Sequence, residues 1–274
     1  MQRMLKLLAE VYRTLSRSRS VVHGAVLLRN QLDHVIKYRF GETYYTANAA
    51  SDLLWRVLGP EVELFVDVGA NIGDWSAAML RFAENARRGI LFEPGNAAQA
   101  RLAERFGRDA RITVVPKAAG AQSSSVSFYE EPDAGEGSGL LAQFASARAV
   151  RRRVEMVSLD DEMENRGEPT IDALKIDAEG CDLEVLRGAS ALIAEQAIRF
   201  IQFEYNSHWR VRGATLLAAE TLLREAGYET FLIDKQGLYR SNVMRYGEYF
   251  AYSNYLATRR SDVTRLSRII IGKM

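Results

Sequence analysis

The chain of 274 residues is 47% hydrophobic, which is enough to bury a substantial core in one main domain. Its formal net charge is +1, from 36 Lys and Arg against 35 Asp and Glu, so no global field draws it to nucleic acid and we expect no nucleic-acid partner. Cys181 is the only cysteine, which excludes an intrachain disulfide and a cysteine-based zinc site, and the sequence shows neither a cleavable leader nor a long apolar run, so we expect a cytoplasmic protein.

Residues 1–20 predict an amphipathic basic helix, the first element of a helical N-terminal extension that we place at residues 1–58. Such a helix packs on its own domain or on a second subunit more often than it lies on a membrane, so we favour packing and keep membrane contact as the alternative. The stretch 256–274, which we treat as a basic C-terminal tail, leaves the same choice open, and a homo-oligomer would cover either segment. The apolar positions of the first helix are Met4, Leu5, Leu8, Val11, Tyr12 and Leu15, and the basic ones are Arg3, Lys6, Arg13 and Arg17.

The chain alternates short apolar runs with helical patterns from Val62 onward, which is typical of βαβ units and predicts an α/β fold with a mainly parallel sheet. We expect about seven strands. The first strand starts at Leu64, and Asp74 is placed to cap the helix that follows it. The other predicted strands cover 90–92, 112–115, 171–176, 198–203, 228–233 and 248–252, and the predicted helices cover 74–87, 96–106, 182–195 and 214–226.

An interruption separates the third of these strands from the fourth. It holds two further β-like runs, 125–129 and 154–158, on either side of the glycine-rich stretch 134–140. Such a loop either closes over a substrate or serves as a plain connector, and the sequence favours neither. The three arginines at 151–153 are typical of a solvated edge, and we assign them no role.

The first strand runs into a glycine turn in LFVDVGANIG, which contains Asp67, Gly69, Asn71 and Gly73. Glycine accepts positive φ and lets the backbone approach a ligand closely. The next apolar run ends in Glu93, and in a parallel sheet both features meet beyond the carboxyl ends of the strands. An acid in this position is suited to ribose hydroxyls, while the glycine spacing does not fit a dinucleotide pyrophosphate. The pattern therefore predicts a site for a nucleoside without a pyrophosphate.

In a second motif, LKIDAEGCDLEVLRGA, another apolar strand is followed by Asp177 and Glu179. Together with DVGANIG, FEP, SLDDEM and QFEYN, this motif resembles the FkbM family of S-adenosylmethionine-dependent methyltransferases over residues 62–255. The resemblance implies a class I methyltransferase, Rossmann-like fold: a seven-stranded, mainly parallel sheet with helices on both faces and an antiparallel last strand. It also implies a methyltransferase domain over residues 59–255 and methyl transfer to a hydroxyl of a sugar, glycan or secondary metabolite.

The resemblance also implies which residues contact the cofactor. The first turn would surround the methionine and ribose parts of S-adenosylmethionine, and Glu93 would bind the ribose hydroxyls. The acids of the second motif would lie near the sulfonium and the acceptor, and the residues after the third strand would lie near the adenine. The full set is Asp67, Gly69, Asn71, Gly73, Glu93, Lys117, Ala118, Asp177 and Glu179.

A hydroxyl acceptor is a poor nucleophile, so a base that takes its proton would accelerate transfer. The candidates are Asp177, Glu204 and His208, because each follows a predicted strand at the edge where the site would lie, and histidine titrates near neutral pH. Two acids without a dense set of further ligands do not predict a metal site.

Two other functions stay open on the residues alone. A nicotinamide-dependent oxidoreductase shares the arrangement of strand, turn and acid, although the glycine spacing argues against it. A catalytically silent methyltransferase-like protein that binds partners through its N-terminal helix is the other, and the acids Asp67, Glu93 and Asp177 argue against it.

Overall fold

The computed structural model describes residues 2–40, 44–135 and 137–273. It divides into two units, Met1–Gly41 and Glu42–Met274. The first unit consists of two helices, α1 (Gln2–Leu15) and α2 (Arg19–Phe40), as the extension predicts. None of the helices in the described ranges is both long and apolar enough to cross a membrane.

The predicted boundary at residue 58 is wrong, because α3 (Tyr44–Leu58) belongs to the second unit. Its side chains Leu54, Trp55 and Leu58 are 2% exposed or less and join the core of that unit. The apolar face of α3 is therefore covered by the sheet, and the extension proper ends near residue 41.

The second unit is built on one mixed sheet in the order β12-β10-β9-β11-β8-β7-β1-β2-β3. The five neighbouring strands β3, β2, β1, β7 and β8 are parallel, and β11 is antiparallel to both of its neighbours. This arrangement confirms the predicted class I fold with its antiparallel last strand. The nine strands are β1 (Leu64–Val68), β2 (Arg88–Phe92), β3 (Ile112–Val115), β7 (Ile171–Ile176), β8 (Ile198–Tyr205), β9 (Tyr228–Asp234), β10 (Gly237–Arg240), β11 (Ser253–Arg259) and β12 (Ile270–Lys273).

Two strands exceed the predicted seven, and both extend the sheet beyond β9. β10 forms a hairpin with β9, and β12 pairs in parallel with β10. Residues 256–274 are therefore not a separate tail: they complete β11, form the 3-10 helix η4 (Arg260–Leu266) and end in β12. Leu266 and Ile269 are buried, and Asp262 pairs with Arg259 and Arg265, so this segment folds onto the sheet despite its basic composition.

The last predicted strand, 248–252, is displaced, because the antiparallel strand begins at Ser253. Gly247 and Phe250 both have positive φ, which interrupts extended backbone before that point. The stretch 248–252 is the more apolar of the two, and pairing with β8 and β9, not hydrophobicity, places the strand at 253–259.

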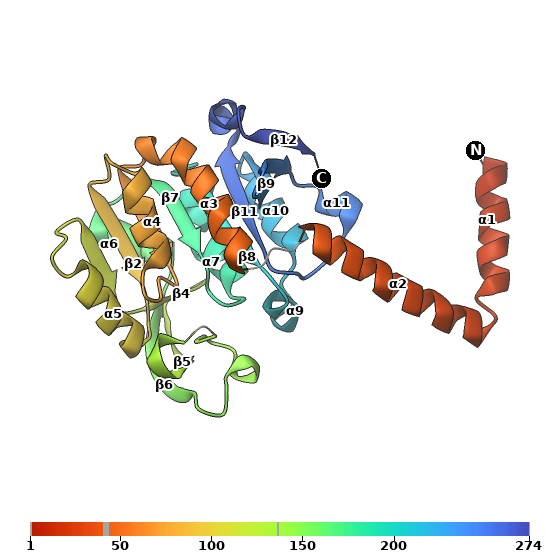
Figure 1. Cartoon of the computed structure of the whole chain (residues 1–274), viewed down its shortest axis with the longest axis horizontal. Helices are drawn as coiled ribbons and strands as arrows, with labels where there is room; N and C mark the ends of the chain where they lie inside the picture. Colours follow the sequence, from red (N-terminus) through yellow and green to blue (C-terminus); the bar gives the residue numbers. More distant parts are fainter. Residues whose placement is uncertain (1, 41–43, 136, 274) are drawn as a thin grey trace. The chain divides into compact units, whose positions relative to one another are not determined.

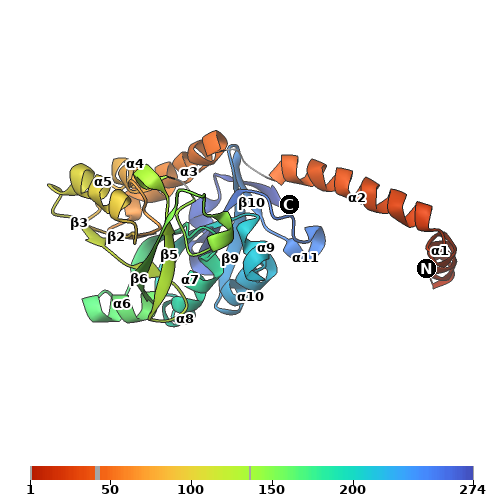
Figure 2. The ribbon, with the colours of Figure 1, turned by 90° about the horizontal axis from the view of Figure 1, so that it is seen from below.

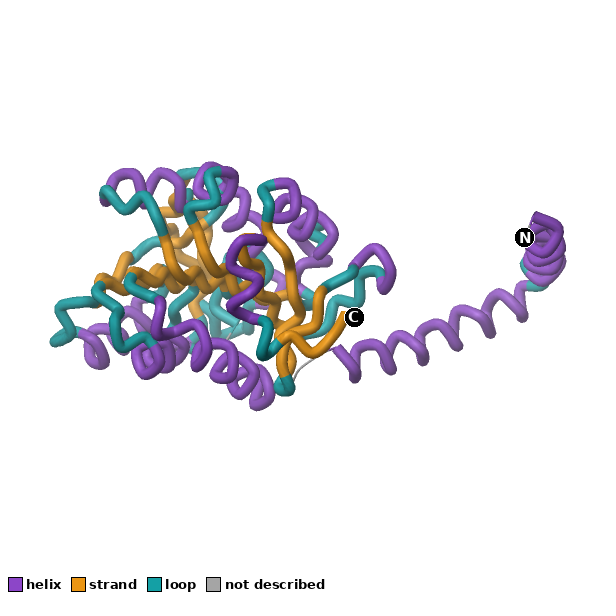
Figure 3. The backbone as a smooth tube through the Cα atoms, turned by 90° about the horizontal axis from the view of Figure 1, so that it is seen from above, coloured by secondary structure: helices purple, strands orange, loops and turns teal. Residues whose placement is uncertain are grey.

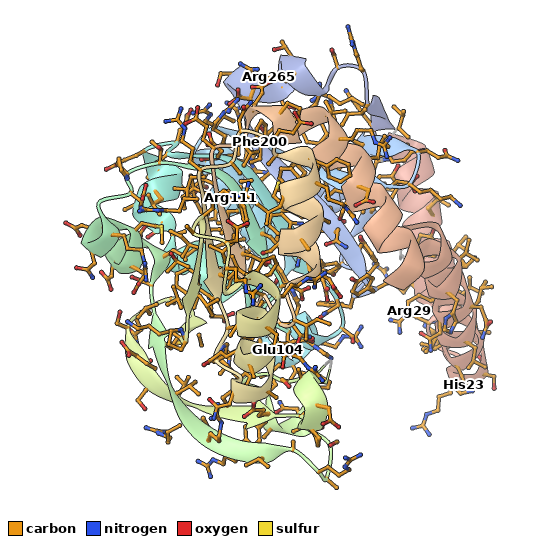
Figure 4. All side chains as sticks on the ribbon, turned by 60° about the vertical axis from the view of Figure 1, so that its left-hand side comes forward. His23, Arg29, Glu104, Arg111, Phe200 and Arg265 are labelled. Carbon is orange, nitrogen blue, oxygen red and sulfur yellow. The ribbon has the colours of Figure 1, made fainter. Side chains whose placement is uncertain are left out.

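Helices cover both faces of the sheet, and Figure 3 shows the sheet between two helical layers. The helices α3, α4 (Asp74–Phe82) and α5 (Asn96–Phe106) lie on one face. The other face is covered by α6 (Leu159–Arg166), α7 (Asp182–Gly188), α8 (Ser190–Ala194) and α10 (Leu216–Glu225) (Figure 2). Between these layers lies the core, in which Phe200 (labelled in Figure 4) is fully buried. Short helices complete the unit: η1 (Gly59–Glu61), α9 (His208–Arg212) and α11 (Val243–Tyr246).

Two predicted helices differ in extent from the observed ones. The helix predicted over 74–87 ends at Phe82, and the residue that caps it is Gly73, with Asp74 as its first residue. The helix predicted over 182–195 is divided into α7 and α8 at Ala189.

A second sheet of three strands, in the order β4-β6-β5, forms from the interruption in the sequence (green in Figure 1). Its strands are β4 (Ala118–Ala119), β5 (Ser124–Glu130) and β6 (Val150–Val157). The loop between β5 and β6 contains the 3-10 helices η2 (Pro132–Ala134) and η3 (Ala142–Phe144) and is held by Glu131, which accepts hydrogen bonds from Ser146 N and Oγ. Gly139, within the glycine-rich stretch, exchanges two backbone hydrogen bonds with Tyr129 and is thereby held against β5.

Candidate active site

A cavity of about 870 Å³ opens where β1, β2, β7 and β8 end. The turns that follow these strands line it on one side, and the loop between β5 and β6 lines it on the other. Of the residues that the sequence analysis selects, all of which the structure describes, Gly73 alone does not line this cavity. The sheet thus brings the predicted cofactor and base residues to one place.

The turn after β1 is locked against the ends of two neighbouring strands. Gly69 N and Ala70 N both donate to Phe92 O at 3.0 Å. Gly69 has φ +76°, and a Cβ at this position would overlap the carbonyl oxygen of Asp177. Glycine is therefore required here by the close approach of two backbone segments, as well as by its φ.

Gly73 has a packing role instead of a place in the cavity. It caps α4 with φ +81°, and a Cβ would lie 2.5 Å from the ring of Phe106 on α5. The sequence motif therefore combines one glycine that shapes the cavity with one that lets two helices approach.

Glu93 follows β2 and is held at the cavity by two backbone groups. Its Oε2 accepts a hydrogen bond from Asn71 N at 2.8 Å, and its Oε1 accepts one from Gly95 N at 2.7 Å. Only 6% of Glu93 is exposed, and burial raises the pKa of its carboxyl to about 7 in spite of these bonds. Each carboxylate oxygen keeps a second lone pair for a ligand donor.

Asp67 lies below the turn, on β1. Its Oδ2 accepts a hydrogen bond from Ser76 Oγ at 2.6 Å, and burial raises its pKa to about 6. The pairing register places Lys175 of β7 beside Asp67, and Gln202 of β8 beside Lys175. A row of polar side chains thus crosses the otherwise apolar sheet under the cavity.

Lys175 is a site residue that the sequence analysis missed. It is 7% exposed, and its Nζ lies 2.9 Å from Asp177 Oδ2. Burial alone lowers the pKa of Lys175, but attraction to Asp177 and Asp67 outweighs it and leaves the pKa above its ordinary value. A lysine between the apolar residues of LKI was the available signal, since a lysine in a buried strand needs a charged partner.

The acids of β7 and β8 converge on the far side of the cavity. Glu204 is 5% exposed, and burial, together with the charges of Asp177 and Asp182, raises its pKa well above the ordinary value. Its Oε1 accepts a hydrogen bond from Asn206 Nδ2. Burial also raises the pKa of Asp182 to about 7, so this end of the site has an excess of acid groups around one lysine.

His208 begins α9 at the same end of the cavity. Its Nδ1 lies 3.3 Å from Glu179 Oε2, although the two atoms are not aligned for a hydrogen bond. The ring of Phe144 lies over the imidazole with 3.8 Å between centroids. Phe144 comes from the loop between β5 and β6, so this loop reaches across the cavity to a candidate base.

The third strand leads to Lys117 and Ala118, the residues expected near adenine. Lys117 Nζ lies 3.0 Å from Glu155 and 3.5 Å from Glu162, and the first of these contacts is the main cause that raises its pKa. Ala118 packs with Phe128 in a small apolar cluster that lines the cavity. Phe128 was not predicted, because β5 carries no motif that marks it.

A buried polar network connects α3 to the floor of the cavity. Gln202 Oε1 accepts hydrogen bonds from Trp55 Nε1 at 2.8 Å and from Trp75 Nε1 at 3.4 Å. Gln202 Nε2 donates to Ser51 Oγ at 2.9 Å and to Asn254 Oδ1 at 3.3 Å. Residues of α3 therefore shape the site, which the sequence analysis did not foresee.

Comparison with known proteins gives a family for this arrangement. The family described as Methyltransferase FkbM domain matches residues 67–230, more than half of the chain. Hexuronic acid methyltransferase AglP from Haloferax volcanii is 30% identical over 165 residues, which are 60% of this chain and 64% of that protein. The chain thus spans less than two thirds of the length of this relative.

Solved structures with similar coordinates are more distant. The methyltransferase FkbM from Methylobacillus flagellatus gives a TM-score of 0.47 at 18% identity, over 85% of this chain and 60% of that one. An rRNA methylase from Streptococcus thermophilus gives a TM-score of 0.41 at 7% identity, over 76% and 93% of the two chains. The family match, which runs from within β1 to within β9 and includes every predicted site residue, carries the assignment: the chain belongs to the FkbM methyltransferase domain family.

Proposed function

We propose that this chain is an S-adenosylmethionine-dependent methyltransferase that transfers a methyl group to a hydroxyl oxygen of a sugar or glycan. Family membership supports the activity, and the sugar named in the description of AglP supports the acceptor class. The observation that carries the proposal is the Glu93 carboxylate, fixed by Asn71 N and Gly95 N with its remaining lone pairs available to ribose hydroxyls.

The cavity fits this cofactor on two further grounds. The wall formed by Ala118 and Phe128 is apolar and suits an adenine ring. Burial and the charges of Asp177 and Asp182 raise the pKa of Glu204, so Lys175 alone does not balance the acid groups at the end of β8. When bound, S-adenosylmethionine would supply a positive sulfonium that carries the methyl group. One charge pair at about 4 Å is worth roughly 4 kcal/mol at an effective dielectric near 20, before desolvation is subtracted.

The residues of this chain would accelerate transfer mainly by position. The backbone of Gly69 packs closely against the carbonyl of Asp177 at the end of β7, and this contact fixes the two sides of the cavity relative to each other. Holding an acceptor oxygen in line with the reacting carbon supplies about 7–11 kcal/mol through proximity and orientation.

The proton of the acceptor hydroxyl needs a base, and we assign this role to His208. Asp177 Oδ2 is already paired with Lys175 Nζ at 2.9 Å, and the raised pKa of Glu204 favours its protonated form. His208 lines the cavity beneath the ring of Phe144, and its Nδ1 lies 3.3 Å from Glu179 Oε2. An imidazole in this place can accept the proton of an acceptor hydroxyl.

Cofactor binding tests the first part of the proposal. We expect calorimetry to show S-adenosylmethionine binding to the full chain, and Glu93→Ala to weaken it roughly 10- to 100-fold, because hydrogen bonds to a charged group are worth about 1.5–3 kcal/mol. Glu104→Ala, which removes a carboxylate on the exposed surface of α5 (labelled in Figure 4), is the matched control and leaves affinity unchanged. Equal affinity of the two variants would remove Glu93 from the site, and NADH binding without S-adenosylmethionine binding would favour an oxidoreductase.

Methyl transfer tests the second part. We expect label from the methyl donor to enter a neutral or acidic sugar in a panel of glycans, and not amines or nucleic acids. His208→Asn should lower kcat by roughly 10²- to 10⁴-fold and leave cofactor affinity unchanged. Labelling of another acceptor class would keep the cofactor assignment and contradict the sugar.

A further inference from the structure

The charge of this chain is divided unevenly along its sequence. Residues 1–40 hold eight of the 36 Lys and Arg but two of the 35 Asp and Glu, which is a net charge of +6. The remaining residues hold 28 basic and 33 acidic side chains, which is a net charge of −5. The overall value of +1 therefore conceals a strongly basic helical unit.

The α1 helix separates its apolar and charged side chains. Leu8, Val11, Tyr12 and Leu15 recur at spacings of three and four and form one face, and all are between 40% and 65% exposed. Lys6 and Arg13 are seven residues apart and lie on the opposite face. A short helix with an apolar face, a basic face and low mean hydropathy is the type that lies in the plane of a membrane surface.

The α2 helix extends the exposed apolar surface. Val21, Leu28 and Leu32 recur at helical spacing on one face and are 42%, 61% and 55% exposed. Side chains project on all sides of this helix, and Figure 4 labels His23 and Arg29 among them. Exposed apolar area of this extent on a two-helix unit indicates a surface that binds another apolar surface.

We infer that the N-terminal unit, defined as α1 and α2, binds the surface of a membrane with anionic lipids. Such a surface supplies both features that the unit lacks: an apolar phase for the leucine and valine side chains, and negative charge for the arginines and lysines. A second copy of the unit offers an apolar face but carries the same +6, so the two would repel. Nucleic acid offers negative charge but leaves the apolar face in water.

Vesicle sedimentation of the full chain tests this inference. We expect the protein to sediment with vesicles of phosphatidylcholine and phosphatidylglycerol, and to sediment far less with phosphatidylcholine alone. Lys6→Gln with Arg13→Gln should lower the partition coefficient roughly 10- to 30-fold, because each cation near an anionic surface contributes about fivefold. Leu8→Gln with Leu15→Gln should lower it at least about tenfold at unchanged charge.

Matched double variants in the second unit control for charge and hydrophobicity. Arg108→Gln with Arg260→Gln removes two exposed cations, and Val150→Gln with Met244→Gln removes two exposed apolar side chains. Neither should change partitioning. Far-UV circular dichroism of every variant verifies that the helices persist.

Three results would overturn the inference. Sedimentation that is equal for anionic and neutral vesicles would remove the charge argument, and equal partitioning of the α1 variants and their controls would remove the unit as the contact. A dimer in sedimentation velocity that Leu8→Gln with Leu15→Gln dissociates, without vesicle binding, would show that a second copy covers the apolar face. None of these variants changes a residue that lines the cavity, so none should change cofactor affinity. The vesicle experiment can therefore fail while the proposed function holds, and the reverse.

Discussion

At the scale of single residues, Glu93 couples the site to pH. Its folded-state pKa of about 7 lies above the usual 4.5, so the folded protein binds this proton more tightly than the unfolded chain does. Stability associated with Glu93 is therefore full below about pH 4.5 and is lost as pH rises through about 7.

We expect wild type to lose up to about 3 kcal/mol of unfolding free energy relative to Glu93→Gln between pH 4.5 and 8, because one pKa unit corresponds to 1.36 kcal/mol. Urea unfolding of both proteins across this range measures the difference. A constant difference would show that Glu93 ionises at its ordinary pKa.

Lys175 is the second residue with a measurable consequence. Lys175→Met leaves Asp177 and Asp67 without their cation in a buried place, which should cost about 3–5 kcal/mol of unfolding free energy. Lys235→Met removes an exposed lysine as a control and should cost no more than about 0.5 kcal/mol. Similar urea midpoints for the two variants would mean that water replaces the buried ammonium.

The sequence predicted the acids and glycines of the site better than it predicted their partners. Glu93 and Asp177 stand out because each ends an apolar strand. Lys175 and Gln202 were missed because each is a single polar residue inside a strand, and only the pairing register shows that they are neighbours of Asp67. Gly73 was placed in the site because its motif does not distinguish a ligand contact from helix packing.

At the scale of elements, the loop between β5 and β6 lines the cavity and also contacts His208 through the ring of Phe144. Phe144→Ala removes the ring that lies over His208, and an aromatic pair is worth about 0.5–1.5 kcal/mol. On the proposed function, we expect KM for the acceptor to rise roughly 2- to 10-fold with unchanged cofactor affinity. Val150→Ala, on β6 and 59% exposed, serves as the control. An effect on cofactor affinity instead would place the loop over the nucleoside.

Element prediction succeeded where periodicity and turn residues agree. The five parallel strands β1, β2, β3, β7 and β8 were located within a few residues, because each is a short apolar run between clear turns. The antiparallel strand was displaced, since the run before it is more apolar than its own first residues, Ser253 and Asn254, and its register depends on two distant strands. Local pattern does not encode that choice.

At the scale of the whole molecule, the two units differ in how their apolar residues are covered. Trp55→Ala in α3 should cost about 3–5 kcal/mol, since the side chain is 2% exposed and its indole N–H is bonded to Gln202. Leu28→Ala in α2, where the side chain is 61% exposed, should change unfolding free energy by less than about 0.5 kcal/mol. Urea unfolding compares them, and equal losses would mean that α2 is as well packed as α3.

The composition of the whole chain was a poor guide, because it averages over two units that differ in charge. A net charge near zero argued against a nucleic-acid partner, and it concealed that residues 1–40 are strongly basic. The predicted boundary at residue 58 combined α3 with that basic segment, because both are helical and neither carries a family motif.

The amide of Gln202 has consequences for recombination between relatives. Its four hydrogen-bond partners come from separate parts of the chain. Two of them, Ser51 and Trp55, precede the residues that match the family. A chimera that replaces residues 1–58 would remove Ser51 and Trp55 and leave Gln202 with Trp75 and Asn254 as its remaining partners beneath the cavity. Replacements that end before residue 44 keep α3 and should give folded hybrids, whereas replacements that include α3 should need a compensating change at Gln202 of β8.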